Sequence, residues 1–219
     1  MTSIMFLAII AAYLIGSVPS GYVVVKLLTG RELTQIGSGR TGGTNAMRAG
    51  GLIAGLLTGA LDILKGTCAI WLTRWLLTGQ VVTVSPLPWV EAMAGVAVVI
   101  GHNWSIFLNF RGGAGTGPNV GAAIAFLPYS GLLLPPFVVL ILILTGYASI
   151  ASLCAAALVP IVFAFAARYI GLPWAFVGYG LATFAIITFA LRPNIARLLN
   201  GTERRVRFEW WTRHHPFAD

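Results

Sequence analysis

The sequence has little charge. Only 9% of its 219 residues are Asp, Glu, Lys or Arg, whereas 58% are hydrophobic, and the mean hydropathy is +0.86. A soluble protein needs many polar groups to cover its surface, and this chain does not have them. The composition excludes a soluble globular protein and predicts a polytopic membrane protein.

Cysteine and acidic residues are also scarce. The two cysteines, Cys68 and Cys154, lie in apolar segments, which favours small buried hydrophobic side chains over a disulfide or metal ligands. No group of His, Cys, Asp or Glu has the spacing of a metal site, so we expect neither a metal nor a cofactor. The formal charge of +8 would favour nucleic acid in a soluble protein. In a membrane protein it sets the topology instead, and no nucleic-acid partner is expected.

Seven hydrophobic runs are present, and most approach the roughly 20 residues that cross a bilayer. They lie at about Ile4–Leu28, Leu52–Leu77, Pro88–Leu108, Asn119–Leu127, Gly131–Leu144, Ile150–Ala167 and Pro173–Leu191. The first lacks a preceding basic segment, so we expect it to be retained as a membrane helix. We expect an all-α, polytopic integral membrane fold of about seven transmembrane helices, in a single domain over residues 1–219.

The fourth run is too short to cross a bilayer alone. It begins after Pro118 and meets Pro128 about ten residues later. Proline suits the first position of a helix, so this run resembles a half-helix whose N-terminus points at the loop that contains Arg111. A tilted or re-entrant packing element is the alternative.

Arginine is concentrated on one side of the predicted membrane. If the N-terminus lies outside, the outer side receives little basic charge beyond Arg168, and the side of Arg74 stays open. Basic loops remain in the cytoplasm, so we expect the N-terminus outside and the C-terminus inside. The arginines expected on the cytoplasmic side are Arg31, Arg40, Arg48, Arg111, Arg192, Arg197, Arg204, Arg205, Arg207 and Arg213.

Two glycine-rich loops on this side are candidate anion sites. The first spans Gly37–Asn45 and is followed by Arg48, and the second spans Arg111–Asn119. Glycine lets the backbone approach a ligand, successive amides can converge on an oxyanion, and a guanidinium pairs with phosphate or carboxylate. The first loop lacks the lysine and spacing of a Walker A loop, and neither has the setting of a dinucleotide fingerprint.

Other polar residues leave alternatives open. Asp62 and Lys65 share one face of an apolar helix, either as a mutual ion pair or with Lys65 reaching an anionic ligand. His102 is either an interfacial hydrogen-bonding residue or part of a site. Asn194 and Arg197 lie three apart on a predicted helical turn, where an ordinary basic tail that contacts lipid is the alternative.

Five segments then occur in a particular order: Gly16–Pro19, Ile36–Arg48, Leu61–Gly66, Gly101–Trp104 and Asn194–Glu203. Together they resemble the bacterial acyl-phosphate:glycerol-3-phosphate acyltransferases of the PlsY type, over nearly the whole chain. In that family the cytoplasmic motifs read GSGNxGATNxxR, GHxFPxFxxFKGGKGVAT and HxxNIxRLxxGxE, on a seven-helix membrane fold.

The resemblance implies acyl transfer from acyl phosphate to the 1-hydroxyl of glycerol 3-phosphate. The products are 1-acyl-glycerol 3-phosphate (lysophosphatidate) and phosphate, in phospholipid synthesis. Acyl phosphate, glycerol 3-phosphate and membrane lipid are the implied partners. The implied location is the bacterial cytoplasmic membrane, with the active site facing the cytoplasm. The HxxxxD motif of other glycerolipid acyltransferases does not occur at a position where it could serve the reaction. We therefore expect direct attack of the glycerol 3-phosphate hydroxyl on the acyl phosphate rather than a covalent acyl-enzyme.

The resemblance also implies the residues of one pocket. The expected catalytic residues are Ser38, Arg48, His102 and Asn194. The expected substrate-binding residues are Gly37, Gly39, Arg40, Thr44, Asn45, Lys65, Arg111, Gly112, Gly113, Arg197 and Glu203.

The chain departs from the family pattern within these motifs. Arg40 stands in place of asparagine, Ala114 in place of the lysine of GGKG, Ser105 in place of proline, residues 116–118 in place of VAT, and Leu191 in place of histidine. Arg40 could supply, from the facing loop, the cation lost at Ala114. The losses at Ala114 and Leu191 also fit a non-catalytic lipid- or anion-binding paralogue. A small anion transporter is a third hypothesis, disfavoured because polar residues cluster near one face.

Overall fold

The computed structural model describes residues 2–78 and 87–206, and the expectations for Arg207 and Arg213 lie outside these residues. Within the described part of the chain the regular elements are all helical, as predicted. They are α1 (Thr2–Ser17), α2 (Ser20–Thr29), η1 (Leu33–Gln35), α3 (Gly43–Leu77), α4 (Leu87–Asn103), η2 (Ile106–Leu108), α5 (Thr116–Phe126), α6 (Ser130–Thr145), α7 (Ala148–Ile170), α8 (Trp174–Ala190) and α9 (Arg192–Leu199).

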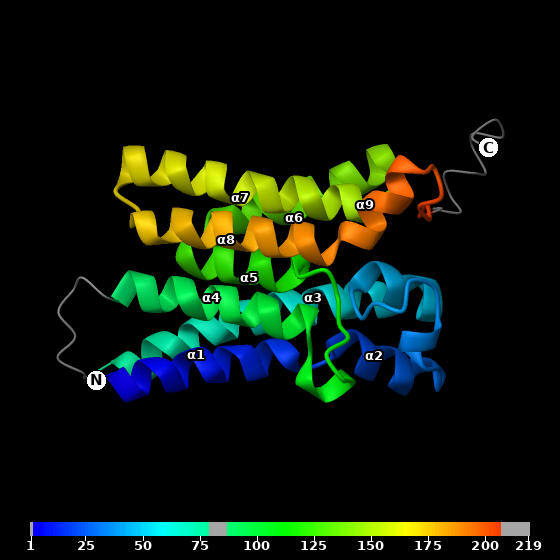
Figure 1. Ribbon diagram of the computed structural model, residues 1–219, viewed down its shortest axis with the longest axis horizontal. Coiled ribbons are helices and arrows are strands. Elements are labelled where there is room, and N and C mark those ends of the chain that lie inside the picture. The colour runs from blue at the N-terminus through cyan, green and yellow to red at the C-terminus, as the bar shows by residue number, and fades with distance from the viewer. Residues whose placement is uncertain (1, 79–86, 207–219) are drawn as a thin grey trace.

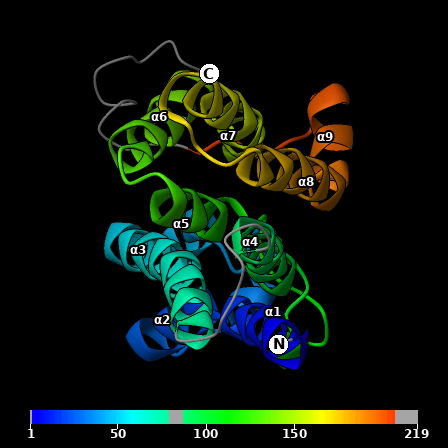
Figure 2. The same cartoon turned by 90° about the vertical axis from the view of Figure 1, so that its left-hand side faces the viewer.

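The helices form two groups joined by a short central helix. In Figures 1 and 2, α1 to α4 lie on one side and α6 to α9 on the other, with α5 between them. Helix α5 packs against α3, α4, α6, α7 and α8. The chain between α2 and α3, the chain between α4 and α5, and α9 all lie at the same end of the molecule.

The hydrophobic runs correspond to helices, with two corrections at their ends. The first run is broken at Val18 and Pro19 into α1 and α2, because proline cannot continue the backbone ladder of α1. The third was predicted to reach Leu108, but α4 ends at Asn103. Among the described residues, three stretches are long and apolar enough to span a membrane, namely Ser3–Thr29, Gly43–Leu77 and Ala148–Ile170. Helices α8 and α9, bent by 61°, make a fourth if they are one broken span. The count of seven crossings stays a prediction.

Helix α3 has a sharp break near its start. The predicted span began at Leu52, and the preceding residue, Gly51, has φ 80° and ψ −178°. A side chain at this position would be strained, so glycine permits the break. The residues before Gly51 form a separate helical segment that carries Asn45 and Arg48, which is why both belong to the site rather than to the long apolar span.

The short fourth run is a helix of 11 residues, α5, as predicted. Pro118 is its third residue instead of its first, still within the turn that needs no amide donor. Helix α5 packs so closely on α3 that a Cβ on Gly121 would overlap the carbonyl of Ile63, so glycine permits this contact. At its other side Tyr179 Oη donates to Asn119 Oδ1 at 2.6 Å. These contacts fix the N-terminal end of α5 beside both loops.

An ion pair joins α3 to α4. The Glu91 side chain is buried, and its Oε2 lies 2.7 Å from Arg74 Nη2. Arg74 also donates to the carbonyl of Ala125 at 2.9 Å. A buried charge is stable only when it is paired, so this ion pair fastens α3 to α4 and α5.

Candidate active site

A cavity of about 610 Å³, here called the main cavity, lies where the two groups of helices meet at the loop end. Its wall comes from the first loop, the second loop and helices α3 to α7, together with α9 and the chain after it. The polar side chains that line it are Ser38, Arg40, Thr44, Asn45, Arg48, Asp62, His102, Thr116, Ser149, Ser152, Asn194, Arg197, Glu203 and Arg204.

The first loop is organised by Asn45. Its Oδ1 accepts from the amide of Ser38 at 3.1 Å, and its Nδ2 donates to the carbonyls of Ile36 and Arg40, each at 2.9 Å. Gly37 and Gly39 have φ of 60° and 70°, which lets the chain wrap around this amide. One buried side chain therefore holds the loop's shape.

The second loop is organised differently, because its glycines pack against the end of α4. A Cβ on Gly112 would overlap the carbonyl of His102, and a Cβ on Gly113 would overlap its Nε2. The amide of Gly113 donates to the carbonyl of His102 at 3.0 Å. The amide of Gly113 is thus occupied by the protein itself, and Gly113 sets the distance between the loop and the His102 ring.

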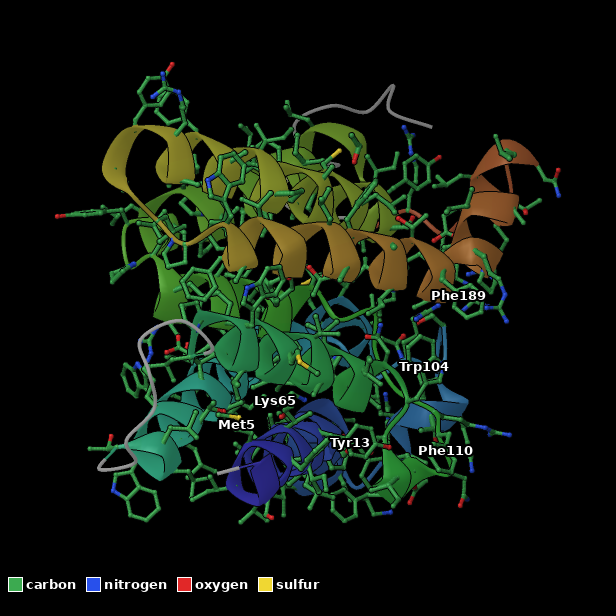
Figure 3. The ribbon with its side chains drawn as sticks, turned by 60° about the vertical axis from the view of Figure 1, so that its left-hand side comes forward. Met5, Tyr13, Lys65, Trp104, Phe110 and Phe189 are labelled. Carbon is green, nitrogen blue, oxygen red and sulfur yellow. The ribbon has the colours of Figure 1, made fainter. Side chains whose placement is uncertain are left out.

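A buried polar cluster lies beneath this contact. Lys65 Nζ lies 2.9 Å from Asp62 Oδ1 and 2.9 Å from His102 Nδ1, and it also donates to the carbonyl of Val18. An ammonium has only donors, so His102 Nδ1 accepts and the neutral ring carries its proton on Nε2. Lys65 lies in the interior of the helix bundle (Figure 3). The ion pair is present, and Lys65 supports Asp62 and His102, which themselves line the main cavity.

Glu203 links the two helices, α7 and α9, that form the C-terminal part of the cavity wall. Its Oε1 accepts from Asn194 Nδ2 at 2.7 Å and from Ser149 Oγ at 3.3 Å, and its Oε2 accepts from Arg197 Nε at 2.8 Å. The Glu203 side chain is only 8% exposed, so these three donors supply most of its solvation. The carboxylate therefore fixes α9 and α7 relative to each other.

Arg40 joins the two loops. Its Nη1 donates to the carbonyl of Gly113 at 2.8 Å, and its Nη2 donates to the carbonyl of Ala190 at the end of α8. Burial, and after it the nearby charge of Arg197, lower the pKa of the Arg40 guanidinium from its ordinary value. The expectation that Arg40 reaches the second loop is confirmed.

The rest of the main cavity is apolar. Leu56, Ala60 and Ile63 of α3 line one side, and Val139 and Leu142 of α6 are among the residues that line the other. Leu56 and Val139 are 64% and 54% exposed, so this part is open along its side. A membrane protein can accept an alkyl chain from the surrounding lipid through such an opening.

Arg111 and Lys65 do not line the main cavity, contrary to the prediction that all the named side chains share one pocket. Arg111 instead lines a second pocket of about 430 Å³. Four residues line both this second pocket and the main cavity, namely Ser38, Arg40, Asn194 and Arg197. Gly112 also lines this second pocket. Gly39 lines it as well, while Gly37 and Thr44 line the main cavity. The prediction of a shared pocket is correct for Ser38, Asn45, Arg48 and Arg197.

Several lining residues were missed. Ser149 and Ser152 are single hydroxyls in the long apolar run of α7, and Thr116 opens α5. Thr116 Oγ1 donates to Ser152 Oγ at 2.7 Å. Arg204 was treated only as a topogenic charge, yet it lines the cavity, and its carbonyl accepts from Arg48 Nη2 at 3.3 Å. The position of Arg204 next to Glu203 was the one available signal.

A chain with this arrangement of residues matches a known protein family. The model of the family described as glycerol-3-phosphate acyltransferase matches residues 6–201. The chain belongs to this glycerol-3-phosphate acyltransferase family. It is 38% identical over 200 residues to glycerol-3-phosphate acyltransferase 2 of Moorella thermoacetica, covering 91% of this chain and 96% of that protein. It is 33% identical over 205 residues to the glycerol-3-phosphate acyltransferase of Halalkalibacterium halodurans, covering 92% and 95%.

Solved structures of the family share the fold. The crystal structure of PlsY (YgiH), an integral membrane glycerol 3-phosphate acyltransferase, in its glycerol 3-phosphate form superposes with a TM-score of 0.78 at 31% identity, covering 98% of this chain and 99% of that one. Its lysophosphatidic acid form gives a TM-score of 0.76 at 31% identity, covering 93% and 95%. The acyltransferase family membership and the integral membrane fold were therefore predicted correctly.

Proposed function

We propose that the protein transfers an acyl group from acyl phosphate to the 1-hydroxyl of glycerol 3-phosphate in the main cavity. The observation that carries this proposal is the composition of the cavity wall, which joins a polar end with several arginines to an apolar part open between α3 and α6. Acyl transfer to glycerol 3-phosphate produces a molecule that has a polar phosphate end and an apolar acyl chain, which match the polar and apolar parts of the cavity. The relatives named glycerol-3-phosphate acyltransferase, and the related structures in glycerol 3-phosphate and lysophosphatidic acid forms, support acyl transfer to glycerol 3-phosphate.

The arginines of the polar end suit phosphorylated reactants. Arg48, Arg197 and Arg204 line the cavity, and Arg197 is paired with Glu203. Guanidinium groups bind phosphate oxygens through paired hydrogen bonds, and they can stabilise charge on a departing phosphate. Glu203 holds Arg197 and Asn194 in a fixed orientation, so we assign it a positioning role.

The donor is proposed to be acyl phosphate because the cavity supplies no free carboxylate. Among the described residues that line it, Asp62 is paired with Lys65, and Glu203 accepts three hydrogen bonds. A mixed anhydride with phosphoric acid is already activated, so it needs positioning more than a protein nucleophile. The hydroxyl oxygen attacks the acyl carbon, the bond to phosphate oxygen breaks, and the released phosphate takes the hydroxyl proton. No covalent acyl-enzyme is required.

His102 and Ser38 are proposed to act as hydrogen-bond donors to the reactants. The His102 proton on Nε2 makes the ring a donor, and the Lys65 ammonium disfavours a second proton on Nδ1. His102 is thus suited to polarise a carbonyl or to hold a phosphate oxygen, and less suited to act as a general base.

The proposed location is the bacterial cytoplasmic membrane, with the main cavity facing the cytoplasm. Arg40, Arg48, Arg197 and Arg204 all line this cavity, and arginine-rich ends of membrane helices stay on the cytoplasmic side. Both proposed reactants carry a charged phosphate group that stays in water, which fits a cavity that opens to the cytoplasm.

The test is acyl transfer by the purified protein, with radiolabelled glycerol 3-phosphate and acyl phosphate. Labelled lysophosphatidate is the expected product. Glu203→Gln should lower kcat/KM by about 10-fold or more, since removing one partner of a charged hydrogen bond costs roughly 1.5–3 kcal/mol. Glu32→Gln is the matched control, because Glu32 pairs with Lys26 away from both pockets and should stay within about twofold. A wild-type protein that binds both reactants without turnover would favour the non-catalytic paralogue, for which Ala114 and Leu191 in the cavity wall are the supporting feature.

A further inference from the structure

The second pocket is built from three separate segments of the chain. Thr34 and Gly39 come from the region of the first loop, Trp104 and Arg111 from the turn after α4, and Arg192 from the start of α9. Trp104, Phe110 and Phe189 lie near one another at this end of the molecule (Figure 3). The pocket is next to the main cavity, because Ser38, Arg40, Asn194 and Arg197 line both.

The second pocket is strongly basic. Arg40, Arg111, Arg192 and Arg197 line it, and among the described residues that line it none is acidic. Arg197 is neutralised in part by Glu203, and Arg192 lies over the Phe189 ring at 4.1 Å from its centroid. Four guanidinium groups around one pocket repel each other, and a bound anion relieves that repulsion.

A second observation at the same place points to a ligand. Asn103 is 5% exposed and lines this pocket, and within the described part of the chain neither its Nδ2 nor its Oδ1 has a hydrogen-bond partner. The Oδ1 of Asn194, which also lines the pocket, is likewise without one. A buried amide left unpaired is destabilising, so such groups in a native fold are usually completed by a ligand or water.

The backbone beside Arg111 is held in an unusual conformation. Asn109 and Phe110 have φ of 51° and 59°, in the left-handed region that residues other than glycine rarely adopt. The turn is tied by the amides of Phe110 and Arg111, which donate to the carbonyls of Ser105 and Leu108. The turn places Arg111 at the pocket wall, apart from the main cavity.

We propose that the second pocket is a phosphate-binding site that small phosphate monoesters or inorganic phosphate occupy on their way into or out of the main cavity. Arginines bind the phosphate oxygens, and the unpaired Nδ2 of Asn103 is an amide donor that the ligand's remaining oxygens can use. Arg40 lies between the two spaces and lines both, and it donates to the carbonyls of Gly113 and Ala190. The route part of this proposal rests on the acyl-transfer function, since it supposes glycerol 3-phosphate entering or phosphate leaving.

Binding is tested first, without turnover. Radiolabelled inorganic phosphate is titrated against the full-length protein in a neutral detergent by equilibrium dialysis, and two sites per chain are expected. Arg111→Gln combined with Arg192→Gln removes one site, whereas Arg48→Gln, which alters only the main cavity, leaves the second. Both substituted arginines are exposed, so folding is expected to be retained. Arg31→Gln is the control for loss of charge on the same side, because Arg31 lines neither pocket. Unchanged stoichiometry in the Arg111/Arg192 variant, or loss of all binding in Arg48→Gln, overturns the proposal.

The steady-state kinetics then identify the occupant. An increase of about 10-fold in KM for glycerol 3-phosphate in the Arg111/Arg192 variant, with kcat within about twofold, identifies the entering substrate. A similar rise in the inhibition constant of inorganic phosphate identifies the leaving product. If both constants are unchanged while phosphate binding is lost, the pocket is not on the route and that part is overturned. A wild type that binds two phosphates without acyl transfer would contradict the proposed function and leave the second site standing.

Discussion

The two glycine-rich loops look alike in sequence and differ in what their glycines do. In the first, Gly37 and Gly39 have left-handed backbone that wraps around the Asn45 side chain. In the second, Gly112 and Gly113 lie against His102 with no space for a Cβ. The first loop is shaped by its own hydrogen bonds, and the second by the helix below it. Glycine content alone therefore does not identify an anion cradle.

The difference predicts which substitution disrupts each loop. We expect the largest loss of stability from a substitution in the buried polar cluster beneath the second loop. Lys65→Met leaves Asp62 buried without its cation and His102 Nδ1 without its donor. Breaking a buried ion pair costs roughly 3–5 kcal/mol, so we expect a large loss of stability in detergent. Asp62→Asn should destabilise comparably. The measurement is Tm, together with the specific activity of the folded fraction. A Lys65→Met protein of wild-type stability and no activity would assign Lys65 to the substrate instead.

The first loop should depend on Asn45. Asn45→Ala removes the acceptor for the Ser38 amide and the donor to the carbonyls of Ile36 and Arg40. Lost buried hydrogen bonds at roughly 1–3 kcal/mol predict a fall in kcat/KM of about 10- to 100-fold. Asn200→Ala, at the exposed end of α9, serves as the matched control and should have little effect. Wild-type turnover in Asn45→Ala would mean that the loop's shape is not set by this side chain.

The second loop should depend on the absence of a side chain at Gly113. Gly113→Ala introduces a methyl group where His102 Nε2 lies, and overpacking of this kind costs roughly 1–3 kcal/mol. We expect lower stability and a fall in kcat of about 10-fold, because His102 lines the cavity. Gly131→Ala controls for the chemistry of the change, since its Cβ would meet Ile124 at an ordinary 3.4 Å. Comparable behaviour of the two variants would show that the close contact at Gly113 is dispensable.

Much of the fold could be predicted from the sequence because its signals are local. Long apolar runs have few alternatives to helix in a membrane, and the short run before Pro128 gave α5. The break at Gly51 was not predicted, because a glycine in an apolar stretch looks the same whether its backbone is helical or left-handed.

The site was predictable only where charge or glycine marked it. Arg48, Asn194 and Arg197 stood out from an apolar background, and they do line the main cavity. Ser149 and Ser152 did not stand out, because a hydroxyl in an apolar helix usually satisfies itself on the preceding turn. Arg111 was assigned to the wrong pocket, since spacing cannot show which side of a left-handed turn a side chain occupies.

The most direct test of the account concerns Arg40, because it alone is proposed to join the two loops into one site. Arg40→Asn removes the hydrogen bonds to the carbonyls of Gly113 and Ala190, and Ala114→Lys introduces a cation on the facing loop. The measurement is kcat/KM for acyl transfer in the wild type, both single variants and the double variant. We expect Arg40→Asn to lose about 100-fold, Ala114→Lys alone to have little effect, and the double variant to recover to within about 10-fold of the wild type, a coupling of roughly 1.4 kcal/mol between the positions. Strictly additive effects, or an Arg40→Asn variant as active as the wild type, would contradict a single site bridged by this arginine.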